Sequence, residues 1–262
     1  MDVRPSGPAL PRRERAFILT GLVGVTALAW VYLLAGAADM EGMTRVSGGI
    51  EGMAAARIAA WSPIEWILMS LMWAIMMVGM MLPSATPTIL LFAAVRRKQR
   101  ARGHDIAPVP AFVIGYLTAW TGFSVAAVVL QWGLERLALL TPMMAAAGTA
   151  FGGVVLVAAG LYQLSPLKHR CLEHCRSPIE FLSRRWRPGV AGAVRMGLEH
   201  GAYCVGCCWV LMALLFVGGV MNLLWVAALA GFVLVEKIAP AGHVVRRIAA
   251  VLLIAWGVYT VV

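Results

Sequence analysis

Apolar runs separated by short basic segments dominate the hydrophobic pattern of this chain. A helix needs about 20 apolar residues to cross a bilayer, and seven runs qualify as candidates, the sixth of them short. The short alternating strands of a transmembrane barrel are not seen. The seven runs are residues 16–37, 65–95, 111–132, 142–162, 196–217, 221–236 and 244–262. The pattern predicts an all-α polytopic bundle of about seven transmembrane helices.

The composition agrees with this pattern. Hydrophobic residues make up 61% of the 262, and only 13% are charged. The mean hydropathy is +0.83, so most of the chain needs an apolar solvent. We expect one integral membrane domain over residues 1–262, with the lipid bilayer as its surroundings.

Basic residues predict the orientation, because lysine and arginine in short loops resist translocation. With the N-terminus inside, the inner segments hold 19 of the 22 basic residues, and the outer loops keep only Arg45, Arg57 and Arg136. This predicts a cytoplasmic N-terminus and a multi-pass protein of the bacterial inner membrane. The net charge is +10. The basic residues that produce it flank the apolar spans and are not interleaved with aromatic residues, which excludes a nucleic-acid partner.

The second run is rich in methionine, with six in the thirteen residues 69–81. Four of them fall within an arc of roughly 80° on a helix, and two lie beside it. Thioethers suit monovalent copper, although methionine is also a common gap-filler in helix packing. The candidate ligands are Met69, Met72, Met76, Met77, Met80 and Met81.

Two prolines follow the methionine stripe, at positions 83 and 87. Each removes a backbone donor and disfavours regular helix just before it. The freed carbonyls, with Ser84, Thr86 and Thr88, would line a polar path if the helix breaks. A simple kink satisfied by neighbouring helices is the alternative.

All five cysteines lie between residues 171 and 208. Cys171 and Cys175 form CxxxC around His174 in the basic segment 163–195, which we predict to be a cytoplasmic loop with an amphipathic helix. The reducing cytosol argues against structural disulfides there.

Glu236 ends the sixth run, and we expect it at the membrane interface.

The remaining cysteines belong to the segment HGAYCVGCCW. His200, Cys204, Cys207 and Cys208 fit within an arc of about 100° on one helix. Nearby glycines allow another backbone to approach, and the loop cysteines can then fold over this face. Thiolates and imidazole are ligands of Cu(I) and Zn(II). The spacing differs from that of a zinc finger, so we favour Cu(I) and keep Zn(II) as the alternative.

The motifs also resemble a known family. MWAIMMVGMMLPSATP, YQLSPLKHRCLEHC, RMGLEHGAYCVGCCWVLMALLFVGGVMNLLW and EKIAP are similar to segments of the bacterial predicted metal-binding integral membrane proteins. The resemblance covers residues 61–257 and implies six or seven helices and a bound metal, but no catalytic residues. The matching positions are Met72, Met76, Met77, Met80, Met81, Cys171, His174, Cys175, His200, Cys204, Cys207 and Cys208.

These features predict a membrane protein that binds Cu(I) for uptake, delivery or homeostasis, with copper-handling membrane proteins as partners. We favour a binding or transport protein over an enzyme. One alternative is a membrane thiol-disulfide oxidoreductase, whose thiols would face outside in oxidative folding. Another is a structural or assembly subunit that holds zinc. The chain has no GxxxxGK[ST] loop, which argues against an ATP-driven pump.

Overall fold

The computed structural model describes residues 10–46, 61–103, 107–141, 144–240 and 242–261. Its regular structure is helical, and these residues contain no strand beyond an isolated bridge between Leu140 and Ala146. This confirms the all-α prediction. The helices are α1 (Arg12–Val46), α3 (Pro63–Arg100), α4 (Val109–Arg136), α5 (Thr149–Leu164), α6 (Pro166–Arg176), α7 (Pro178–Arg185), α8 (Gly189–Ala213), α9 (Leu215–Gly218), α10 (Leu223–Ile238) and α11 (Gly242–Val261).

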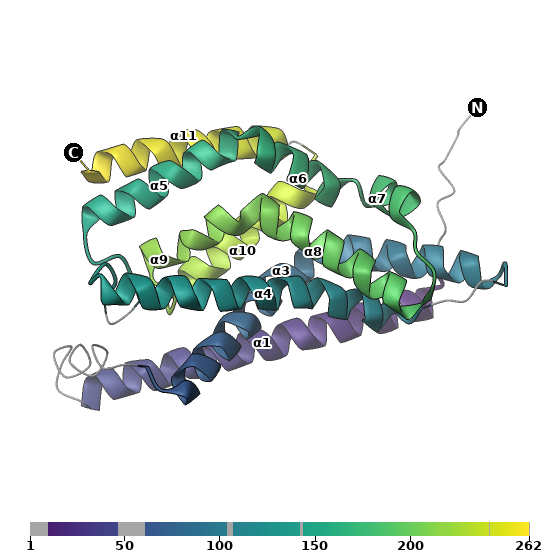
Figure 1. Ribbon diagram of the computed structural model, residues 1–262, viewed down its shortest axis with the longest axis horizontal. Helices are drawn as coiled ribbons and strands as arrows, with labels where there is room; N and C mark the ends of the chain where they lie inside the picture. The colour runs from purple at the N-terminus through teal and green to yellow at the C-terminus, as the bar shows by residue number, and fades with distance from the viewer. Residues whose placement is uncertain (1–9, 47–60, 104–106, 142–143, 241, 262) are drawn as a thin grey trace.

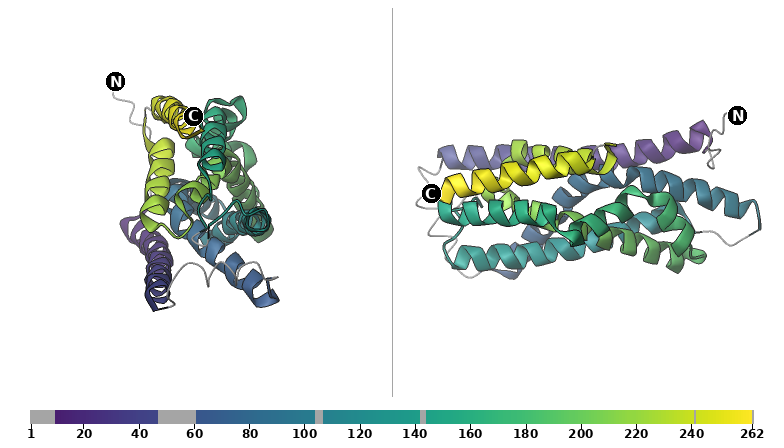
Figure 2. Two further views of the ribbon diagram at one scale, coloured as in Figure 1. Left: turned by 90° about the vertical axis from the view of Figure 1, so that its left-hand side faces the viewer. Right: turned by 90° about the horizontal axis from the view of Figure 1, so that it is seen from above.

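The long helices run roughly along one axis and form an elongated bundle (Figure 1). Helix α11 packs along α5, α8 along α4, and α1 along α3. Helix α1 begins at one end of the long axis and α11 finishes at the other (Figure 2). An odd number of membrane crossings would give this arrangement.

In the described part of the chain, five helices are long and apolar enough to cross a membrane: α1, α3, α4, α8 with its α9 extension, and α11. Helices α5 and α6 make a sixth candidate together, although they meet at a bend of 64°. Helix α10 has only 16 residues. The fourth run was expected to start at residue 142, which lies outside the described residues, and its helix begins at Thr149. The count of seven spans and the cytoplasmic N-terminus stay predictions, and Arg57 of the predicted outer loops lies outside the described residues.

Helices α4 and α8 touch through their backbones. A Cβ atom at Gly115 would collide with the carbonyl oxygen of Val194, and one at Gly197 would collide with that of Phe112. Small residues permit such close approach in membrane bundles. Helix α8 carries His200 and three of the cysteines, so this contact fixes their position.

Helix α3 continues through both prolines, so the break that Pro83 and Pro87 allowed does not occur. Pro83 cannot donate to the carbonyl of Gly79, four residues earlier. That oxygen accepts a hydrogen bond from the Trp30 indole of α1 at 3.3 Å. At Pro83, the structure therefore follows the alternative in which a neighbouring helix satisfies the freed carbonyl.

A buried ion pair joins α6 to α10. Lys168 Nζ lies 2.9 Å from Glu236 Oε2, and the two side chains are 0% and 2% exposed. Arg176, at the other end of α6, donates to the carbonyl oxygens of Glu236 and Ala239. Glu236 thus binds α6 within the protein, and its expected position at the level of the membrane interface stays a prediction.

Candidate functional site

Four cysteine side chains gather between α6 and α8, and we call them the thiol group: Cys175, Cys204, Cys207 and Cys208. The side chain of Cys204 interacts with those of the other three, and that of Cys175 with Cys207 as well. The three on α8 are each 1% exposed. The spacing of these three along one helix face, with α6 folded over it, produces the cluster.

Two of these thiols are directed at backbone. Cys207 Sγ and Cys208 Sγ donate to the carbonyl oxygen of Cys204 at 3.1 Å and 2.9 Å. Within the described part of the chain, no three His, Cys, Asp or Glu side chains are arranged as ligands of a metal ion. A thiol must lose its proton to ligate metal. Binding at the thiol group therefore requires these two side chains to leave the carbonyl and turn toward a shared centre.

Polar groups from three other helices surround Cys204. Lys237 Nζ of α10 lies 2.9 Å from its sulfur and 3.0 Å from Ser84 Oγ of α3. The hydroxyl of Tyr116, on α4, lies 3.1 Å from the same sulfur and also donates to the carbonyl of Met81. Lys237 is only 9% exposed. A buried ammonium beside a thiol compensates the negative charge that a thiolate ligand carries.

The histidines take different positions. His200 is 3% exposed and lies one turn before Cys204, among the rings of Phe112, Tyr116 and Phe181. Its Nδ1 has no hydrogen-bond partner among the described residues. His174 stacks on Tyr203 with ring centroids 4.3 Å apart and is exposed. His200 thus lies one turn from the thiol group along α8, whereas His174 packs against Tyr203 at the surface of the protein.

Cys171 lies one turn before Cys175 on α6. Its sulfur rests against Gly206 of α8, where a Cβ atom would come within 2.9 Å of it. It is only partly buried. The absence of a side chain at position 206 lets α6 approach α8, as the glycine pattern predicted, and places the fifth cysteine at the edge of the thiol group.

The methionine stripe divides into two parts along α3. Met77, Met80 and Met81 are buried in the bundle core. Met76 is equally buried, and together with the partly buried Met69 and Met72 it lines a cavity between α1, α3 and the start of α10. Tyr116 connects α3 to the thiol group, because its hydroxyl contacts both the backbone carbonyl of Met81 and the sulfur of Cys204.

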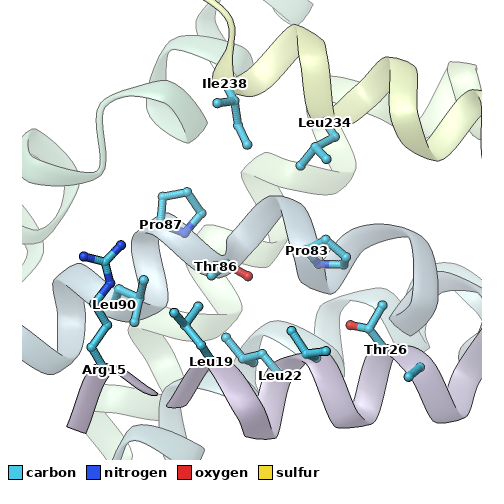
Figure 3. A pocket seen from close by; sticks show the side chains of 12 residues that line it. Arg15, Leu19, Leu22, Thr26, Pro83, Thr86, Pro87, Leu90, Leu234 and Ile238 are labelled. Carbon is cyan, nitrogen blue, oxygen red and sulfur yellow. The ribbon is translucent and has the colours of Figure 1, made fainter. Parts of the chain in front are cut away.

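A larger groove runs between α1, the two prolines of α3 and the end of α10 (Figure 3). Its volume is about 660 Å³. Leucines and the proline rings form most of its wall, and Arg15, Thr26 and Thr86 supply the polar side chains. None of the described residues in its wall carries a sulfur or imidazole ligand, so the chemistry of this wall does not suit a soft metal ion.

The sequence analysis did not identify Tyr116 and Lys237 as residues of the site. It named Ser84 for a polar path along α3, but not as a contact of Lys237. The missed signal was strongest for Lys237, because it is an ionisable residue directly after an apolar run, and ionisable residues near apolar segments are candidates for functional sites. The sequence also contains Cys204-Val205-Gly206-Cys207, a CxxC spacing found in thiol oxidoreductases. Tyr116 carried no comparable signal, because its role depends on how α4 packs against α8.

Comparison with known proteins gave one positive result. The family model PpoB2, described as copper chaperone, matches residues 70–260. This range contains the whole thiol group and Lys237. Searches against curated proteins and against solved structures gave no match.

Proposed function

The chain belongs to the PpoB2 family of copper chaperones, and from this premise we propose that it binds Cu(I) at the thiol group in the bacterial inner membrane and passes it to another protein. The observation that carries the proposal is the convergence of Cys175, Cys204, Cys207 and Cys208 beside a buried lysine. Thiolates are the preferred ligands of Cu(I) in proteins. His200 lies one turn before Cys204 on α8, and Cys171 lies one turn before Cys175 on α6, so these two side chains are candidates for further ligands.

Delivery or uptake suits the arrangement better than export. Thioethers lie toward the end of the bundle where α3 begins, and thiols lie farther along it. Thioethers are neutral donors and thiolates are charged ones, so affinity rises from the methionines to the cysteines. With the predicted topology, this gradient draws Cu(I) from the outer side toward the cytoplasmic side.

The test is metal content after anaerobic purification in detergent. We expect the parent protein to retain copper, and a variant with Cys175, Cys204, Cys207 and Cys208 all changed to serine to retain none at the thiol group. Circular dichroism and a monodisperse elution profile would show that the variant is folded. Zinc in place of copper would support the structural-subunit alternative, and unchanged copper in the variant would refute the proposal.

Changing Lys237→Met is expected to weaken Cu(I) binding about 10–100-fold, the usual cost of removing a residue that supports a metal ligand. The reason is that a thiolate at Cys204 would lose its compensating charge. Lys237→Arg should retain most of the affinity. Competition with a Cu(I)-specific chelator measures the change, and Lys98→Met, at an exposed lysine of α3, is the matched control. Equal affinities for both methionine variants would contradict the role of Lys237.

A thiol oxidoreductase is the second candidate, favoured by the CxxC spacing of Cys204 and Cys207. Both thiols lie in the bundle core, and Cys207 donates to the carbonyl of Cys204. Trapping free thiols with an alkylating reagent before and after mild oxidation distinguishes the two functions. A disulfide between Cys204 and Cys207 that forms and is reduced during turnover would favour the oxidoreductase.

A further inference from the structure

A separate cavity of about 240 Å³ lies between α1, α3 and the beginning of α10. Four methionine side chains line it. Met69, Met72 and Met76 come from successive turns of α3, and Met221 comes from the connection between α9 and α10. Two segments about 150 positions apart, from the first and last thirds of the chain, thus bring their thioethers to one space.

The chemistry of this lining is selective. Among the described residues that line it, the other side chains are apolar except for Tyr32, and none carries a carboxylate, thiol or imidazole. Hard cations such as Mg²⁺ and Ca²⁺ need oxygen ligands and have no partners here. Thioethers are soft, neutral donors that bind Cu(I), and Ag(I) behaves in the same way. A monovalent ion suits an apolar cavity better than a divalent one, because its desolvation costs less.

The cavity and the thiol group are too far apart to share one ion. Ser84 contacts Lys237 beside Cys204 and lies eight, twelve and fifteen residues after Met76, Met72 and Met69 on α3. At 1.5 Å per residue, these separations are about 12, 18 and 22 Å along the helix axis. Metal–sulfur bonds measure about 2.3 Å. Any ion held by these methionines therefore occupies its own site.

We propose that Met69, Met72, Met76 and Met221 form a second binding site for a monovalent soft metal ion, distinct from the thiol group. This inference rests on the proposed copper function and adds a separate loading point to it. Met76, Met77, Met80 and Met81 continue along α3 toward the thiol group and supply thioethers over the intervening distance. The site is more than the methionine stripe of α3, because Met221 lines the cavity from the connection between α9 and α10.

The experiment counts Ag(I) ions bound to the full-length protein by native mass spectrometry in detergent. We expect the parent to hold two ions. A variant with Met69→Leu, Met72→Leu and Met221→Leu should hold one, and the four-serine variant of the thiol group should also hold one. The double variant Met196→Leu and Met212→Leu removes two buried methionines outside the cavity and should still hold two.

The outcomes separate the two claims. The second site would be overturned if the triple leucine variant still bound two ions. It would also be overturned if the parent bound a single ion that the serine variant did not bind, and the thiol site would then remain supported. Two ions in the serine variant together with one in the leucine variant would overturn the thiol site alone. If the triple variant fails to fold, Met221→Leu by itself should lower the affinity for one Ag(I) at least tenfold, and an unchanged affinity would overturn the inference.

Discussion

Replacing Lys168 by methionine is expected to destabilise the protein by about 3–5 kcal/mol, the usual cost of breaking a buried pair by removing one partner. The Glu236 carboxylate would remain between α6 and α10 without its cation. Its second oxygen, Oε1, already has no hydrogen-bond partner among the described residues. Scanning fluorimetry in detergent would record the change as a large fall in apparent melting temperature.

The control for this prediction is the double variant Lys168→Met and Glu236→Gln. It removes both charges, so most of the lost stability should return, because replacing a whole buried pair is often close to neutral. Lys98→Met changes an exposed lysine in the same way and should have little effect. If Lys168→Met alone melts like the parent, the pair between α6 and α10 does not hold the two helices together.

Gly115→Val is expected to have a comparable effect on stability. The added Cβ atom would collide with the carbonyl of Val194, which is backbone and cannot move aside as a flexible side chain would. Overpacking costs about 1–3 kcal/mol where side chains can adjust, and we expect the upper end of this range or more here. The measurement is the yield of monodisperse protein and its apparent melting temperature in detergent.

Gly122→Val provides the matched control for this second prediction. Gly122 lies two turns farther along α4, and a Cβ atom there meets nothing within 4 Å. The same substitution has the same cost in helix propensity at both positions, so any difference between the variants reports the contact with α8. Equal stability of the two valine variants would show that α4 and α8 do not touch at Gly115.

The helices themselves were predictable because their apolar runs are long and their flanks are charged. Boundaries were less predictable where polar residues continue a helix, as at Gly189, where α8 begins seven residues before the expected run. The bend between α5 and α6 could not be foreseen, since Ser165 and Pro166 are equally typical of a loop.

The candidate site was predictable in part for a similar reason. Local spacing put His200, Cys204, Cys207 and Cys208 on one helix face, and the same spacing argument put Met69, Met72 and Met76 on another. Contacts between distant segments carry no periodic signal in the sequence. Lys237 beside Cys204, and Met221 beside the α3 methionines, therefore appeared only with the fold.

The backbone contact between α4 and α8 has a consequence for how an ion would leave the protein. Cys204, Cys207 and Cys208 belong to α8 and are immobilised with it, whereas Cys175 belongs to α6, which follows a 64° bend and is held to α10 by side chains. An ion bound by all four thiols would therefore join two elements that are fixed in different ways. Its release to a recipient would require both the bond to Cys175 on α6 and the bonds to the thiols of α8 to break.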